Sequence, residues 1–360
     1  MSRGLAGRAR TRVVLDPSPR RYRAEWGFVV PEEEKTVPDG EFAGDSAAPL
    51  ILADLSEEAL LARITPGLPG GDAVIVGPGD DTAVLRADEA TIVTTDAAVR
   101  GRDWRDDWSS AADVGAKIIA QNLADVAAMG GRPLGVVVTL LADPATPLAW
   151  VEDFSAGLGA AARKAGAAVL GGDLSSAPPG VLAVSVTALG TLDGRAPVLR
   201  SGARTGDAVA VAGTLGRSAA GLLLLQQGRA EADAELVGVH RRPQPPLAEG
   251  PRAADAGATA MLDVSDGLLR DGARLAAASG VCLDFSRTAL APYAARLAPA
   301  VGDSAAWDAV LGGGEEHALL ACFPGAVPAG WTVIGTVRRG AGVAVDGIPM
   351  QPRGWDHFHG

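Results

Sequence analysis

Apolar and polar positions follow two different periods along the chain from about residue 50 onward. Short apolar runs rich in β-branched residues predict strands, whereas longer stretches with apolar positions three and four apart predict helices. In the first half the pattern predicts a helix starting at Ser56, helices at 109–129 and 147–165, and strands at 73–76, 90–95, 135–141, 167–170 and 181–192. Single helices between strands indicate a mixed α/β (α+β) fold.

The second half continues in the same way after a change near residue 193. Strands are predicted at 207–212, 258–262 and 318–323, and helices at 218–227 and in a segment that ends near residue 279. Because 360 residues exceed one small core, we expect two domains, at 50–192 and 193–360. Residues 1–49 carry seven arginines in their first 23 positions and no sustained apolar period, which predicts a disordered or atypical extension.

Composition narrows the class of protein. The formal net charge of -11 and the lack of a basic block in the folded part argue against a general nucleic-acid binder. No apolar run reaches the length of a membrane span and the N-terminus has no secretory apolar core, so we expect a cytoplasmic protein. Cys282 and Cys322 lack metal or redox spacing and are expected to be ordinary thiols, with a disulfide as the open alternative.

Carboxylates recur just after predicted strands. Asp80 and Asp81 lie in a glycine-rich turn at 77–83, and further carboxylates follow at Asp96, Asp173, Asp263 and Asp266. Adjacent carboxylates between apolar runs are costly unless water or a cation neutralises them. Since Mg²⁺ binds carboxylates together with phosphate oxygens, the pattern predicts one magnesium–phosphate site.

Each of these motifs also has a purely structural interpretation. Ser265 or Asp263 could be a helix N-cap, and the segment ending in Asp96 a plain strand end. The Gly172-Asp173 pair could be an ordinary turn, and Asn122 with Asp125 could form helix-to-helix hydrogen bonds. No Walker A loop, dinucleotide fingerprint, nucleophile elbow or zinc motif is present.

Taken in order, the motifs resemble the thiamine-monophosphate kinase family, which shares an ATP-binding superfamily with aminoimidazole-ribonucleotide synthetase and selenide water dikinase. The matching segments are 77–81, 94–96, 117 with 122–130, 171–173, 200–202, 263–268, 313–315 and 355–358. The resemblance implies two α/β domains, with N-terminal halves that pair in a homodimer. It also implies ATP-dependent phosphorylation of thiamine monophosphate to thiamine diphosphate, with ATP and several Mg²⁺ ions.

The same resemblance assigns roles to individual residues. It implies magnesium ligands at Asp81, Thr94, Thr95, Asp96, Asp125, Asp173, Asp263 and Asp266. Of these, Asp81, Asp125, Asp263 and Asp266 would be catalytic. Gly172, Asp173, Arg200 and Ser265 would contact ATP, and Asp103, Glu315 and Trp355 the thiamine phosphate. Because the acceptor phosphate is already ionised, the reaction requires no catalytic base.

The chain departs from the family pattern at the substrate end. Asp103 stands where the family commonly has histidine, and Glu316 where aspartate is usual after Glu315. The metal positions are all retained, so phosphoryl transfer is the firmer expectation. The alternatives are a superfamily enzyme that acts on another small phosphate or acid, and a non-catalytic regulator that binds nucleotide or thiamine phosphate.

Overall fold

The computed structural model describes residues 49–78, 83–87 and 90–355, and it confirms the mixed α/β class. Residues 1–48 of the predicted extension, Asp80 and Asp81 lie outside the described residues. The division into domains at residue 192 stays a prediction. None of the helices in the described ranges is both long enough and apolar enough to cross a membrane.

The described chain begins with short elements. Helix α1 (Glu57–Ile64) starts as predicted, because the Ser56 Oγ accepts a hydrogen bond from the Ala59 N–H at 3.2 Å. Two 3₁₀ turns flank it, at Leu52–Asp54 and Thr65–Gly67. Strand β1 (Val74–Val76) then pairs antiparallel with β2 (Val84–Leu85).

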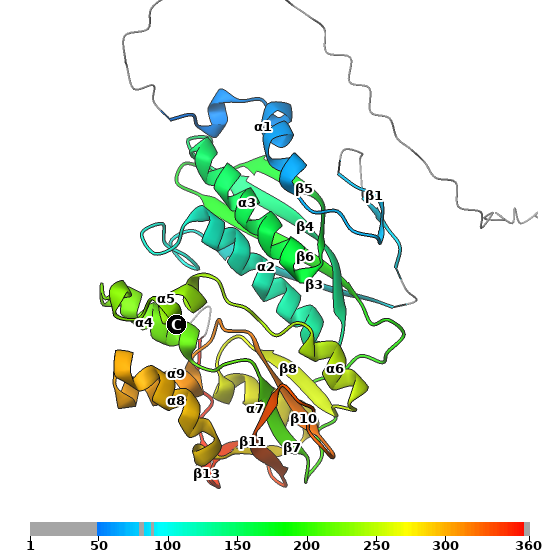
Figure 1. Ribbon diagram of the computed structural model, residues 1–360, viewed down its shortest axis with the longest axis vertical. Coiled ribbons are helices and arrows are strands. Elements are labelled where there is room, and N and C mark those ends of the chain that lie inside the picture. The colour runs from blue at the N-terminus through cyan, green and yellow to red at the C-terminus, as the bar shows by residue number, and fades with distance from the viewer. Residues whose placement is uncertain (1–48, 79–82, 88–89, 356–360) are drawn as a thin grey trace, which may run out of the picture. The chain divides into compact units, whose positions relative to one another are not determined.

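A four-stranded sheet follows, in the order β3-β6-β4-β5. Its strands are β3 (Thr91–Val99), β4 (Arg132–Ala142), β5 (Ala168–Ser176) and β6 (Leu182–Thr191). Only β4 and β5 are parallel; the other two pairs are antiparallel. Helices α2 (Ala111–Ala128) and α3 (Leu148–Ala165) cover one face (Figure 1), and their apolar side chains share a core with all four strands.

Two strands of this sheet are longer than the apolar pattern predicts. Strand β3 runs on to Val99, so Asp96 lies inside it rather than at its end. Strand β5 runs on to Ser176, so Gly172 and Asp173 lie in a strand and not in a turn. A Cβ on Gly172 would stand 1.9 Å from the Val138 carbonyl oxygen, so a glycine permits this approach to β4.

Helices α2 and α3 cross at backbone contact. A Cβ on Gly115 would lie 2.3 Å from the Phe154 carbonyl oxygen, and one on Gly157 would lie 2.2 Å from the Ala112 carbonyl oxygen. Glycine costs helix propensity, so two glycines at one crossing indicate that close packing outweighs that cost. The crossing fixes the depth at which α2 lies on the sheet.

The second, seven-stranded sheet has the order β13-β12-β9-β11-β7-β10-β8, and only β12 and β9 are parallel. Its strands are β7 (Ala208–Ala212), β8 (Ala260–Val264), β9 (Cys282–Phe285), β10 (Ala318–Phe323), β11 (Trp331–Arg338), β12 (Gly342–Val345) and β13 (Ile348–Met350). The helices around it are α4 (Arg217–Gln226), α5 (Ala234–Arg241), α6 (Glu249–Asp255), α7 (Leu268–Ser279), α8 (Arg287–Val301) and α9 (Asp303–Gly312), with a 3₁₀ turn at Ala230–Ala232.

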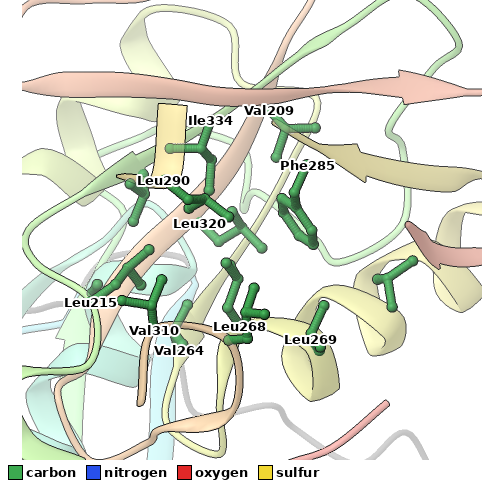
Figure 2. Close-up of a cluster of buried hydrophobic side chains, with 14 of the residues drawn as sticks. Val209, Leu215, Val264, Leu268, Leu269, Phe285, Leu290, Val310, Leu320 and Ile334 are labelled. Atoms are coloured by element: carbon green, nitrogen blue, oxygen red, sulfur yellow. The ribbon is translucent and has the colours of Figure 1, made fainter. Parts of the chain in front are cut away.

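The central strands of this sheet are buried on both faces. Val209 and Val211 of β7 join a core with side chains of α4, α7, α8 and α9, and Figure 2 shows Leu268, Phe285 and Leu320 within that core. Ala210 and Ala212 face the other way, toward the C-terminal end of α2 and toward α6. Continuous apolar runs suit such strands, which explains why the pattern predicted β7, β8 and β10 well.

We predict that the glycine crossing limits stability. Gly157→Ala should lower the free energy of unfolding by about 1–3 kcal/mol, since the new methyl group meets backbone. Gly159→Ala, in the same helix, meets its nearest atoms at 3.4 Å and should be neutral or slightly stabilising. Urea unfolding of both variants checks the prediction, and equal losses would contradict it.

Candidate active site

One cavity of about 1140 Å³ lies where the two halves of the described chain meet. Side chains from β3, α2, α4 and α9 line it, together with the turns at 265–266 and 312–315 and the segment 353–355. Helix α2 gives it Gln121 and Asp125, which are four residues apart and therefore on one face. The cavity has a strongly acidic end, and at its second end Glu315 contacts the buried Lys117, which lines an adjoining small pocket.

Asp125, Asp96 and Asp263 form the acidic end. The Thr94 hydroxyl donates a hydrogen bond to the Asp125 Oδ2 at 2.7 Å. Burial raises the pKa of Asp125 to about 6, and the charges of Asp263 and then Asp96 add to this effect. Carboxylates that repel one another in a partly buried site are stabilised by a cation, so the chemistry of this end fits a hard metal ion.

Asp263 is the penultimate residue of the buried strand β8 and is itself 6 % exposed. The Nδ1 of the equally buried His317 lies 3.0 Å from its Oδ2. Burial alone lowers the pKa of His317, but the hydrogen bond and charge of Asp263 outweigh it, so the pKa is raised. The imidazole therefore fixes one carboxylate oxygen of Asp263, a residue that also lines the cavity.

The turn after β8 is held by residues of α7. The buried carboxylate of Asp271 accepts the Asp266 N–H at 2.8 Å and the Gly267 N–H at 3.0 Å. The N-cap of α7 is Gly267, so the interpretation of Ser265 or Asp263 as the helix cap is wrong. Ser265 and Asp266 line the cavity, and the Asp266 Oδ2 lies 2.7 Å from the Arg274 guanidinium.

A buried polar cluster marks the second end. The Lys117 Nζ lies 2.9 Å from the Glu315 Oε1, and the His240 Nδ1 lies 3.4 Å from the Glu315 Oε2. Burial lowers the pKa of His240 to about 4, helped by the charge of Lys117, so this ring is neutral at neutral pH. Glu315 has a φ of 59°, a strained value for a non-glycine residue that is typical of functional sites.

Comparison with known proteins adds to this geometry. Residues 79–192 match the family model for the N-terminal domain of AIR synthase related proteins. The thiamine-monophosphate kinase of Mycobacterium tuberculosis is 49% identical over 313 residues, which cover 85% of this chain and 93% of the relative. The chain belongs to the thiamine-monophosphate kinase family.

Solved structures agree with this assignment. The crystal structure of thiamine-monophosphate kinase from Stenotrophomonas maltophilia superposes with a TM-score of 0.70 at 32% identity, covering 82% of this chain and 98% of that one. The structure of AaThiL complexed with AMPPCP and TMP superposes with a TM-score of 0.67 at 30% identity, covering 87% of this chain and all of the other.

Most positions that the thiamine-monophosphate kinase resemblance singles out lie at the cavity. Asp103 is in its wall, and its Oδ2 accepts the Val99 N–H at 2.7 Å. Trp355 is 44% exposed and lines the cavity, where its backbone N–H donates to the Asp266 carbonyl oxygen at 3.0 Å. Asp81 lies outside the described residues.

Other positions of the family pattern lie away from the acidic end. Strands β6 and β4 separate β3 from β5, so Asp173 is three strand spacings of about 4.8 Å each from β3. Gly172, Asp173 and Arg200 are not among the cavity-lining residues. Thr95 does line the cavity, although its side chain alternates to the sheet face opposite Thr94 and its hydroxyl donates to the Val186 carbonyl oxygen at 3.0 Å.

Glu316 has a structural role instead of facing substrate. It is 6 % exposed, and its carboxylate accepts the Arg217 N–H at 2.7 Å and the Ser218 N–H at 3.4 Å. It also accepts a hydrogen bond from the Thr214 hydroxyl. Because the N-cap residue of α4 offers no side-chain oxygen, Glu316 caps this helix from a distant part of the chain.

His240 and His317 were not predicted as site residues, because the histidines of the sequence form no zinc motif. Both line the cavity, and neither is near another histidine in sequence. A usable signal was the spacing of Lys117, Gln121 and Asp125, since polar residues every four positions on an apolar helix indicate one functional stripe. Asn122 lies off that stripe, is fully buried, and donates to the Ile118 carbonyl oxygen at 2.9 Å.

We predict that Glu316→Ala lowers the free energy of unfolding by about 1–2 kcal/mol, because the first turn of α4 loses its cap. The matched control is Glu152→Ala, which removes only a half-exposed ion pair with Arg63 and should cost less than about 1 kcal/mol. Thermal unfolding measures both changes. Similar losses in the two variants would contradict the capping role.

Proposed function

We propose that the chain transfers the γ-phosphoryl group of ATP to thiamine monophosphate and produces thiamine diphosphate and ADP. The observation that carries the proposal is one cavity with an acidic end and, at its other end, Glu315 paired with the buried Lys117, in a chain 49% identical to a thiamine-monophosphate kinase. AaThiL, which shares the fold, was captured with AMPPCP and TMP.

The reaction joins two polyanions. An oxygen of the acceptor phosphate attacks the γ-phosphorus, the bond from that phosphorus to the β,γ-bridging oxygen breaks, and ADP leaves. The acceptor oxygen carries no proton that must be removed, so no histidine or lysine has to act as a base. The carboxylates of the acidic end therefore position charge and do not transfer protons.

Asp96, Asp125 and Asp263, with Asp81, Thr94, Thr95, Asp173 and Asp266 by family resemblance, are the residues that would hold magnesium. Magnesium would neutralise the phosphate charge and polarise the γ-phosphoryl group. Within the described ranges no three His, Cys, Asp or Glu side chains form a preassembled metal cage. This arrangement suits Mg²⁺, which commonly takes one or two carboxylates and completes its shell with phosphate oxygens and water.

The proposed placement of ATP and substrate follows the same resemblance. Gly172, Asp173, Arg200 and Ser265 would contact ATP, and Asp103, Glu315 and Trp355 the thiamine phosphate. A cationic thiazolium ring would gain from the face of Trp355. A reaction that consumes ATP makes the cytoplasm the expected compartment.

The decisive experiment is an ADP-release assay with purified protein, ATP and Mg²⁺, with and without thiamine monophosphate. We expect ADP release that depends on thiamine monophosphate and matches the thiamine diphosphate formed. ADP release only with another small phosphate would favour a relative of different specificity. Tight binding of thiamine monophosphate without turnover would favour a regulator.

We also predict that Asp263→Asn and Asp81→Asn each lower kcat by more than about tenfold, because a lost carboxylate misplaces magnesium. Steady-state rates at saturating Mg²⁺ provide the measurement. Asp346→Asn is the control, because this carboxylate lies between β12 and β13, outside the cavity. Near wild-type rates in the two variants would rule out this metal site.

We further propose that the chain forms a homodimer through the open face of the four-stranded sheet. Val93, Val99, Val137 and Leu141 are exposed there, on the side of the sheet opposite α2 and α3. In register, Thr95 of β3 is opposite Thr187 of β6, which is opposite Val137 of β4, so small and apolar side chains continue across the face. Such an uncovered apolar face is typical of a subunit interface.

The dimer prediction is tested with a charge on that face. Val137→Glu should convert the dimer into a monomer, because burying the unpaired carboxylate would be costly. Val333→Glu, at an exposed position in the other sheet, should leave the mass unchanged. Light scattering after size-exclusion chromatography gives both masses. A monomeric wild type, or a dimeric Val137→Glu variant, would contradict this interface.

A further inference from the structure

Helix α2 carries a row of three polar side chains beside the cavity. Lys117, Gln121 and Asp125 follow one another at intervals of four, so their side chains form one stripe, and eight residues span about 12 Å of helix. Asp125 belongs to the acidic end, and Lys117 contacts Glu315 at the other. A substrate with phosphate at the acidic end must therefore place its remaining groups toward the lysine end.

The Lys117–Glu315–His240 cluster sets the protonation of the histidine. Burial alone raises the pKa of Glu315, but the charge of Lys117 and the nearby His240 outweigh it and lower the pKa, so the carboxylate is ionised. His240 is neutral and carries one N–H. An ionised oxygen 3.4 Å from Nδ1 repels a lone pair there and favours the proton on Nδ1. Ser218 Oγ, at 3.2 Å, can accept a hydrogen bond from the same N–H.

The other edge of the ring is left for the cavity. His240 lines the cavity, and because Nδ1 is turned toward Ser218 and Glu315, Nε2 is the ring nitrogen that remains for a ligand and carries no proton. Leu222 and Leu223 of α4 also line the cavity, as does Trp108, whose carbonyl oxygen accepts a hydrogen bond from the side chain of Arg241, the neighbour of His240. An apolar wall beside one fixed hydrogen-bond acceptor suits a flat heteroaromatic ring that bears an amine.

We propose that His240 Nε2 accepts a hydrogen bond from the exocyclic amine of an aminopyrimidine ring, and that Lys117 and Glu315 fix the tautomer that makes this possible. The inference rests on the proposed function and deepens it, since thiamine monophosphate carries such an amine. His240 is then a specificity-determining residue, and Lys117 and Glu315 are positioning residues. An analogue with an oxo group in place of the amine would present a lone pair to Nε2.

The test compares kcat/KM for thiamine monophosphate and for oxythiamine monophosphate, the oxo analogue, at saturating ATP and Mg²⁺. The wild type should prefer the amine by at least about tenfold, because a hydrogen bond is exchanged for a repulsive, unpaired contact. In His240→Phe the preference should fall close to one. Because His240→Phe also loses the Ser218 contact, a second variant is needed.

Glu315→Gln is that second variant. The neutral amide removes the charge that holds the proton on Nδ1, so both tautomers become available and the preference should again drop several-fold. Glu235→Gln makes the same chemical change on α5, in an exposed ion pair with Arg217 outside the cavity, and should keep the wild-type preference. An unchanged preference in Glu315→Gln and His240→Phe, or no preference in the wild type, would overturn the inference.

Failure of the proposed function can be distinguished from failure of this inference. A wild type that phosphorylates neither compound would refute the kinase activity. In that case calorimetry measures the affinity of the wild type and of Glu315→Gln for each of the two compounds. The ratio of the affinities for the amine and the oxo compound then tests the inference. Equal affinities for amine and oxo forms would overturn it, and a preference for the amine that Glu315→Gln abolishes would support it.

Discussion

The burial of helix α2 is the constraint on which the rest of the structure depends. The helix packs against α3 through glycines at backbone contact, covers the four-stranded sheet, and brings Ala127 and Ala128 against the seven-stranded sheet. A helix surrounded in this way has little surface left for polar side chains. Gln121 and Asp125 therefore face the cavity, and Lys117 faces the small pocket beside it, so the position of the cavity follows from the packing.

That packing also explains the electrostatics of the cavity. Three charges at the cavity have a specific charged partner: Glu315 pairs with Lys117, His317 with Asp263 and Arg274 with Asp266. Asp125 accepts a hydrogen bond from the Thr94 hydroxyl, and burial, together with the charges of Asp263 and Asp96, raises its pKa to about 6. The structure thus concentrates unbalanced negative charge at one end, where a cation and phosphate would restore the balance, and keeps the other end nearly neutral.

The sequence predicted those helices and strands whose positions depend on short-range interactions along the chain. Continuous apolar runs located β7, β8 and β10, because those strands are buried on both faces, and Ser56 located the start of α1. Helix α8 was overlooked because Pro292 and Pro299 lie inside it, and prolines normally indicate a helix end. The short strand β9 contains Asp284, which interrupts its apolar pattern.

Site residues were harder to interpret because their roles depend on contacts that are distant in sequence. Glu315 and Glu316 are neighbours in the chain, yet one faces Lys117 in the cavity and the other caps α4. No local pattern separates these roles, because a positive φ at Glu315 and His317 turns successive side chains in unrelated directions. Asp103 and Trp355 were found only through the ordered family motifs, since neither lies in a pattern that implies chemistry by itself.

The two ends of the cavity make different physical demands, and the chain meets them with different means. Phosphate recognition needs strong, long-range charge that tolerates small errors of position, and carboxylates would supply it together with a cation. Recognition of a neutral ring needs a short-range hydrogen bond of defined direction, which a histidine supplies only if its tautomer is fixed. The Lys117–Glu315 pair is costly to bury unless it does more than balance itself. Fixing the proton on His240 Nδ1 is a role that the geometry of this pair allows, and under this proposal the strained backbone at Glu315 would contribute to substrate recognition.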